Sequence, residues 1–180
     1  MVDDRQRCTS PGDTAEWQNL LAQCRGSLFM LARQYLHHPQ EAEDALQEGV
    51  IRFWRSRPRV HDGRAFLYAC VRSAAIDARR ANLTRRRHEH WAGMDAAREA
   101  IATPLLAAPA ERDERRRQIE EALRSLSEEQ REVLVMKIWG DLTFAQIAAA
   151  LHISQNTAAS RYRYGLEHLQ KVLSREVVCE

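Results

Sequence analysis

The chain has 180 residues, of which 44% are hydrophobic, 29% are charged and only 7% are aromatic. Ala, Leu, Glu, Gln and Arg dominate, whereas Gly, Pro and the β-branched residues of strands and hairpins are sparse, which argues against a sandwich, a barrel or a doubly wound sheet. The net charge of +2 is unevenly distributed, because residues 1–51 carry 4 basic and 8 acidic side chains whereas residues 52–90 carry 11 and 3. This asymmetry suggests one face for a protein partner and another for a polyanion.

Three amphipathic helices are predicted in the first half of the chain. Residues 1–12 are polar and form a tail, and Asp13 with Glu16 makes a capping pattern for a helix whose apolar positions recur as far as Tyr35. Pro39 suits the first turn of a second helix, which extends through Phe53. Residues 57–63 form a basic loop, and Asp62 can cap a third helix that continues into the arginines at 85–87.

The helical period fades between residues 91 and 112, which are rich in Ala and interrupted by Pro, as is typical of a linker. Capping boxes at Ser127 and Thr143 then open two further helices, and a tight turn at His152 precedes a long final helix. We therefore expect an all-α protein with two small helical domains joined by a flexible linker. The expected segments are a tail (1–12), a first domain (13–90), the linker (91–112) and a second domain (113–176).

The strongest motif spans residues 143–168, where a capped short helix, a turn and a second capped helix have the spacing of a helix-turn-helix. Its second helix exposes short polar and cationic groups that can hydrogen-bond base edges and phosphates. A plain helical hairpin with a solvated face has the same pattern. The candidate DNA-binding residues here are Gln155, Asn156, Thr157, Ser160, Arg161 and Arg163.

Two other surfaces have a charge pattern that fits a partner. Arginines are interleaved with aromatic residues between positions 52 and 91, a composition that suits distorted or single-stranded nucleic acid. Glu43, Asp44, Gln47 and Glu48 share the outward side of the second helix and could form an acidic docking patch. Each pattern is also what an ordinary solvated helix face looks like.

Signals for catalysis are weak. The sequence has no HExxH, phosphate-binding loop, dinucleotide fingerprint or nucleophile elbow, and its histidines lack ligand spacing to the cysteines. Cys24 and Cys70 lie on apolar stripes and are interpreted as core thiols, although a thiol-dependent sensor or an enzyme remains the alternative from another class. We expect no catalytic residue, no metal and no cofactor. The longest apolar stretch is short and holds two prolines, so we expect no membrane insertion.

With these residues assembled, residues 20–173 resemble an RNA polymerase sigma factor of the extracytoplasmic-function (ECF) class, which has only regions 2 and 4. EAEDALQEGVIRFW (41–54) resembles region 2.2, RAFLYACVRSAAIDARR (64–80) resembles regions 2.3 and 2.4, and residues 126–169 resemble region 4. The third helix departs from the family pattern: where the family often has Trp, Arg and Asn, this chain has Phe66, Ala69 and Ser73.

The resemblance implies a role for each surface. Region 2.2 of the family docks on the β′ coiled coil of core polymerase, which by position implicates Asp44, Gln47, Glu48 and Trp54. Region 4 of the family places its second helix in the −35 major groove and meets the β flap. Region 2 of the family holds the −10 element as the duplex opens, and it captures a base in the loop before the third helix. This implicates Arg57, Arg59, His61, Arg64, Tyr68, Arg72, Ser73, Arg79 and Arg80.

We therefore expect an alternative sigma factor that binds core polymerase, directs it to specific promoters and assists their opening. A helix-turn-helix regulator that does not replace the housekeeping sigma factor is the alternative within DNA binding. Partners implied by the resemblance are core RNA polymerase, promoter DNA and an anti-sigma factor. The cysteines are irregularly spaced with no CxxC, so a reducing cytoplasm is the expected compartment.

Overall fold

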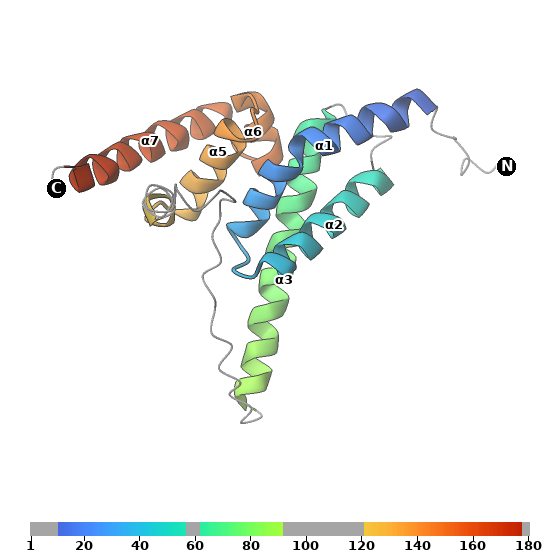
Figure 1. Cartoon of the computed structure of the whole chain (residues 1–180), viewed down its shortest axis with the longest axis horizontal. Coiled ribbons are helices and arrows are strands. Elements are labelled where there is room, and N and C mark those ends of the chain that lie inside the picture. The colour runs from blue at the N-terminus through green and yellow to red at the C-terminus, as the bar shows by residue number, and fades with distance from the viewer. Residues whose placement is uncertain (1–10, 57–61, 92–120, 178–180) are drawn as a thin grey trace.

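A computed structural model describes residues 11–56, 62–91 and 121–177. Every regular element within these ranges is a helix, which confirms the expected all-α class (Figure 1). Most of the expected tail (1–12) and of the expected linker (91–112) lies outside the described residues. The same holds for most of the basic loop at 57–63. Helix α1 (Pro11–Arg33) begins at Pro11, so the predicted start at a cap on Asp13 is wrong by two residues.

The N-terminal unit consists of α1 (Pro11–Arg33), α2 (Pro39–Ser56) and α3 (Gly63–Trp91). Pro39 begins α2, and Asp62 accepts the backbone N–H of Ala65 at 3.0 Å, so both predicted helix starts are confirmed. α2 buries its predicted apolar stripe, including Phe53. Gly49 permits close contact with α3, because a Cβ at this position would lie 2.6 Å from the Cα of Val71.

The C-terminal unit consists of α5 (Glu128–Ile138), α6 (Phe144–Leu151) and α7 (Gln155–Val177). Ser127 caps α5, and Thr143 forms a reciprocal capping box with Gln146 at the start of α6, as predicted. His152 ends α6 in the left-handed region with φ 55° and turns the chain into α7. The helix-turn-helix is therefore present.

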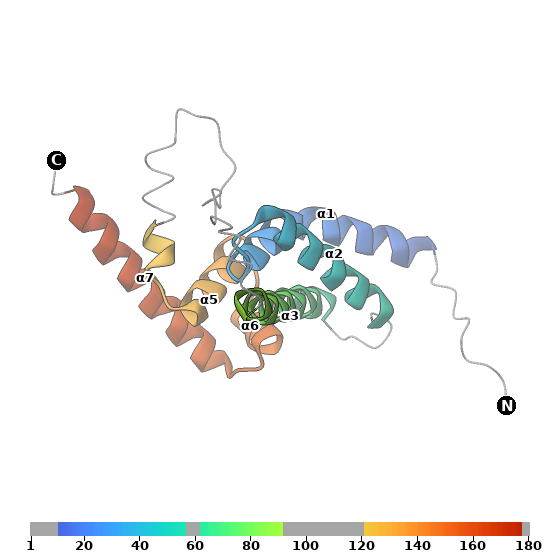
Figure 2. The ribbon, with the colours of Figure 1, turned by 90° about the horizontal axis from the view of Figure 1, so that it is seen from below.

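The two units pack against each other rather than standing apart. α3 lies between the helices α1 and α2 on one side and the C-terminal helices on the other (Figures 1 and 2). α6 packs directly on α3, and α5 packs on α1. One apolar core consequently runs from Leu28 and Leu67 of the first unit to Val133 and Leu142 of the second.

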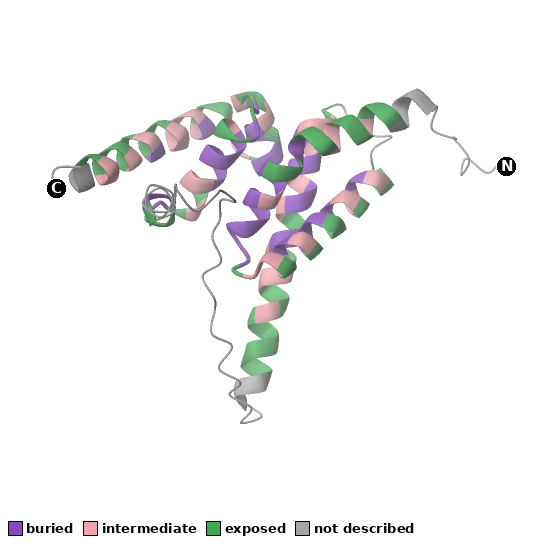
Figure 3. Ribbon diagram, in the orientation of Figure 1, coloured by how far each residue is buried: buried purple, intermediate pink, exposed green. Residues whose placement is uncertain are grey.

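The last turns of α3 project away from this core. Side chains from Arg85 to His88 are all exposed, and Figure 3 shows the exposed stretch as the lower half of the helix. The helix therefore has a packed half inside the body and a basic half in solvent. Among the described helices, none is long and apolar enough to cross a membrane.

Candidate functional site

The outward face of α2 carries the side chains predicted for partner docking. Asp44, Gln47 and Glu48 are exposed, and Trp54 is half-buried. Neighbours hold the two carboxylates, because Gln40 donates to Asp44 at 3.3 Å and Arg52 donates to Glu48 at 2.9 Å. The structure thus brings this set together on one ordered, acidic and accessible surface.

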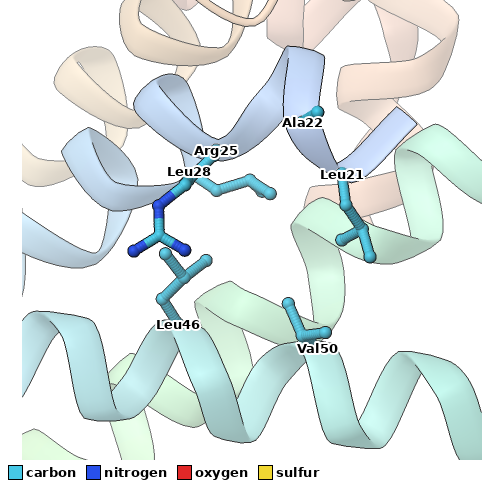
Figure 4. A pocket seen from close by; sticks show the side chains of 6 residues that line it. All are labelled: Leu21, Ala22, Arg25, Leu28, Leu46 and Val50. Atoms are coloured by element: carbon cyan, nitrogen blue, oxygen red, sulfur yellow. The ribbon is translucent and has the colours of Figure 1, made fainter. Parts of the chain in front are cut away.

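A small apolar pocket opens beside this face, between α1 and α2 (Figure 4). Its volume is about 220 Å³. The guanidinium of Arg25 crosses it from α1 and forms an ion pair with Glu43 of α2 at 2.5 Å. The lining residues are Leu21, Ala22, Arg25, Leu28, Leu46 and Val50.

The predicted −10 residues of α3 divide between two faces. We define the inner face as Arg64, Tyr68, Arg72 and Arg79. Successive members are four, four and seven residues apart, so they project from one side of the helix. We define the outer face as Ser73, Arg80, Thr84 and Arg87, all of which are exposed. The two sets have different surroundings.

The arginines of the inner face are bonded to the C-terminal unit. Arg64 donates to the carbonyl of Gly140 at 2.7 Å. Arg72 donates from Nε to Glu132 at 2.7 Å, and Arg79 holds both carboxylate oxygens of Glu128 at 2.5 and 3.3 Å. In this arrangement these arginines are ion-paired or hydrogen-bonded within the chain.

Tyr68, predicted for the −10 region, is buried in this arrangement. Its ring is fully buried, and its hydroxyl lies 2.5 Å from that of Ser27, which itself donates to the carbonyl of Cys24. Burial raises the pKa of the phenol well above its usual range. In this arrangement Tyr68 is a core residue between the two units.

The outer face is open to solvent. Ser73 accepts a weak hydrogen bond from Arg52 at 3.4 Å, and Arg52 is anchored by Asp77 at 2.7 Å. These bonds to Asp77 and Glu48 raise the pKa of Arg52, so its charge is permanent. Arg80 projects from the same side. Arg57, Arg59 and His61, predicted to belong to the base-capturing loop, lie outside the described residues.

The predicted recognition helix is presented at the surface. Gln155, Asn156 and Arg163 are exposed, and Thr157, Ser160 and Arg161 are half-buried. The hydroxyl of Ser154 caps the helix by accepting the N–H of Thr157 at 3.0 Å. Arg163 lies over the ring of Tyr164, 4.9 Å from its centroid. The start of α7 is therefore a rigid polar end of the kind that enters a major groove.

The carboxylates of α5 are a feature of these surfaces that sequence reasoning missed. Glu129 pairs with Arg161 at 2.8 Å, so Glu128, Glu129 and Glu132 together bind three arginines of the predicted DNA-binding sets. Burial raises the pKa of Glu132 to about 7, with Arg161 opposing the shift. The sequence after the predicted cap at Ser127 places Glu128 and Glu129 in the first turn of this helix, but it does not indicate which residues they pair with.

The described residues also bear on redox and metal chemistry. Cys24 and Cys70 are buried free thiols, as their apolar stripes indicated, and burial raises the pKa of Cys70 to about 11. A thiol with such a pKa has almost no nucleophilic thiolate at neutral pH. Within residues 11–56, 62–91 and 121–177, no three His, Cys, Asp or Glu side chains are placed to hold a metal ion.

Comparison with known proteins matches both units to one family. Sigma-70 region 2 matches residues 20–86, and Sigma-70 region 4 matches residues 116–169. The chain is 35% identical over 133 residues to the RNA polymerase sigma factor CarQ of Myxococcus xanthus, which covers 73% of this chain and 74% of the relative. The chain belongs to the extracytoplasmic-function class of RNA polymerase sigma factors.

Other relatives support this membership. The ECF RNA polymerase sigma factor SigK of Mycolicibacterium vanbaalenii is 27% identical in an alignment of 179 positions that covers 96% of this chain and 89% of SigK. The fold is similar to that of the sigma factor RpoE of Bartonella quintana, solved in complex with the anti-sigma factor NepR. That match has a TM-score of 0.62 at 21% identity and covers 89% of this chain and 98% of that one.

The protein is thus an alternative sigma factor and not an enzyme. It binds core RNA polymerase through its region 2 and region 4 domains and directs the polymerase to promoters, the function expected from the sequence. A regulator with only a helix-turn-helix does not account for the region 2 match over residues 20–86.

Proposed function

We propose that the outward face of α2, formed by Asp44, Gln47, Glu48 and Trp54, docks on the β′ coiled coil of core polymerase. The single observation that supports this most strongly is the exposure of three polar side chains on a helix whose opposite side is packed. The carboxylates are held by Gln40 and Arg52, so little side-chain freedom is lost on binding. The apolar pocket beside the face offers a further contact.

The DNA-binding surfaces follow from the same geometry. The start of α7 contacts the −35 major groove, with Gln155 and Asn156 at base edges and Arg163 at phosphate. α3 contacts the −10 element, with Ser73 and Arg80 available in the described arrangement and Arg72 and Arg79 becoming available once released from α5. The outer surface of the C-terminal unit, which exposes Ile138 and Trp139, meets the β flap.

An anti-sigma factor is the further partner, since the fold neighbour was solved bound to one. It would act by covering the α2 face or the start of α7, so that polymerase or DNA is excluded. The site of action is the cytoplasm, because polymerase and chromosomal DNA are there.

The docking proposal is tested by run-off transcription with core polymerase on a pool of genomic promoters. The double variant Asp44→Lys, Glu48→Lys should lose at least about tenfold of promoter-specific transcription, because lysines reverse the charge that this face presents to its partner. Glu167→Lys is the control, because it reverses the charge of one exposed carboxylate on α7, away from the α2 face. Intact transcription by the folded double variant would refute the docking proposal.

A further inference from the structure

The side chain of Arg52 lies between two surfaces that have separate proposed roles. It extends from α2 to α3, where its Nη1 donates to Asp77 at 2.7 Å and, more weakly, to Ser73 at 3.4 Å. Its Nε donates to Glu48 of its own helix at 2.9 Å. Glu48 belongs to the α2 face and Ser73 to the outer face of α3, so one guanidinium contacts both surfaces.

The packing of the two helices brings Arg52 within reach of α3. α2 packs along α3, and Gly49 allows the two backbones to approach closely beside Val71. Arg52 follows Gly49 by about one turn, so its side chain begins at the edge of this close contact. The side chain of Arg52 is 36% exposed, so its bonds form at the surface, where partners can reach the residues that it holds.

Asp77 lies on the same side of α3 as the outer face. It follows Ser73 by four residues and precedes Arg80 by three, which places the three side chains in one row along the helix. A carboxylate in this row would repel the backbone phosphates that Ser73 and Arg80 are proposed to meet. The contact with Arg52 holds this carboxylate on the side of the row that faces α2.

We propose that Arg52 is a positioning residue for both surfaces: it orients the carboxylate of Glu48 toward polymerase and holds that of Asp77 toward α2, away from promoter DNA. The proposal rests on the assignments of the α2 face and of the outer face made above. Arginine suits this task because its planar fork donates from separate nitrogens, here Nε to Glu48 and Nη1 to Asp77. Lysine has the same charge on one compact ammonium and cannot hold the two carboxylates in this geometry.

An ordinary surface ion pair is the competing explanation of these contacts. Ion pairs of this exposure contribute little to stability, and a purely structural pair is lost in the same way when either partner is removed. A positioning role instead makes the effect of Arg52 depend on the carboxylate through which it acts. The tests therefore compare variants of Arg52 with and without each carboxylate.

The first test measures the affinity of the full-length chain, labelled at its N-terminus, for core polymerase by fluorescence anisotropy. Arg52→Lys should weaken binding about two- to tenfold, because Glu48 is no longer held in place before it docks. In the Glu48→Gln background, the same substitution should change the affinity by less than about twofold. Arg55→Lys, at the exposed end of α2, is the matched control and should bind as wild type does.

The second test measures the affinity of the holoenzyme for the promoter that wild type transcribes most strongly from the genomic pool, with core polymerase saturated by each variant. Arg52→Lys should weaken DNA binding about two- to fivefold, because Asp77 is freed to face the phosphates. Adding Asp77→Asn to Arg52→Lys should restore the affinity. The gain must exceed that of Asp77→Asn in wild type, which measures the change in charge alone.

Two results would overturn the proposal. One is equal behaviour of Arg52→Lys and Arg55→Lys, and the other is a loss that persists in the Glu48→Gln and Asp77→Asn backgrounds. If Arg52→Lys does not fold by circular dichroism, Arg52→Gln replaces it and must show the same losses. Failure of both variants to fold would assign Arg52 to the fold alone and would also overturn the proposal.

Single variants separate this inference from the assignments on which it rests. If Glu48→Gln weakens binding to core polymerase but Arg52→Lys does not, only the role of Arg52 is wrong. If Glu48→Gln binds as tightly as wild type, the docking proposal itself is contradicted. An unchanged salt slope of DNA binding in Arg80→Ala would likewise contradict the assignment of the outer face to DNA.

Discussion

The two faces of α3 differ in what their polar side chains do. On the inner face, Arg72 and Arg79 are held by carboxylates of α5, and Tyr68 is sealed between α1 and the C-terminal unit. On the outer face, Ser73 and Arg80 meet solvent. One helix thus presents residues of the same predicted role in two states.

The difference shows that residue type alone does not identify a free binding surface. An arginine on the inner face contributes to the packing of the free chain and would contribute to DNA binding only after release. An arginine on the outer face would contribute to DNA binding alone. Stability and DNA affinity should therefore respond together on one face and separately on the other.

The largest effect is expected at Tyr68. Tyr68→Ala should lower the free energy of unfolding by about 3–5 kcal/mol, because it leaves a cavity in the core shared by the two units. Tyr68→Phe should cost only about 1 kcal/mol, since it keeps the ring and loses the hydroxyl with its contact to Ser27. Urea unfolding followed by circular dichroism measures both. A loss below about 1 kcal/mol for Tyr68→Ala would mean that the two units do not share this core in solution.

The next effect concerns the buried ion pair. Arg72→Ala should lower the free energy of unfolding by about 1–3 kcal/mol at pH 7.5, because Glu132, only 2% exposed, loses its partner. The cost should shrink at pH 5.5, where Glu132 can take up a proton. Ser73→Ala, one residue along on the outer face, is the control and should stay within about 0.5 kcal/mol of wild type. Equal costs for the two variants would contradict the division of α3 into two faces.

Much of the local structure was predictable because it depends on neighbouring residues. Caps at Asp62, Ser127 and Thr143 and the proline at the start of α2 act within one helical turn, and all four are present. The helix-turn-helix is equally local. These features need only the sequence within a few positions.

The packing of α3 was harder to predict because the helix is covered on two sides. In the sequence, Leu67 and Val71 lie on one apolar stripe of this helix. In the structure Tyr68 and Ala75 are buried as well, since the C-terminal unit covers a second side. The pairs Arg72–Glu132 and Arg64–Gly140 join residues 60 and 76 positions apart, which no local pattern reveals.

A smaller effect is expected from pH. The groups that face Glu132 are Arg72 of α3 and Arg161 of α7, yet burial dominates and raises its pKa from 4.5 to about 7. Between these values the folded chain keeps a proton that the unfolded chain releases, so this contribution to stability is complete below pH 4.5 and is lost as pH rises through 7.

Glu132→Gln should remove that dependence. Between pH 5 and pH 8, wild type should lose about 2 kcal/mol more unfolding free energy than the variant, as measured by urea titration at each pH. Glu129→Gln on the same helix is the control, because its carboxylate is 65% exposed and should keep the wild-type profile. Parallel profiles for wild type and Glu132→Gln would show that this carboxyl titrates normally.

The smallest effect on stability is expected on the outer face, where DNA binding alone should change. Arg80→Ala should leave the unfolding free energy within about 0.5 kcal/mol of wild type, because the side chain is exposed. In the complex with polymerase, it should lower the slope of log affinity against log salt by about one, since one phosphate contact and its released counterion are lost. Arg55→Ala removes the same charge from the exposed end of α2 and should leave the slope unchanged.

The salt slope is a better test of a phosphate contact than the affinity is. A distant charge can change the affinity through the field around the protein without displacing a counterion from DNA. An unchanged slope for Arg80→Ala would mean that this arginine merely faces solvent, and that the −10 contacts lie on the inner face.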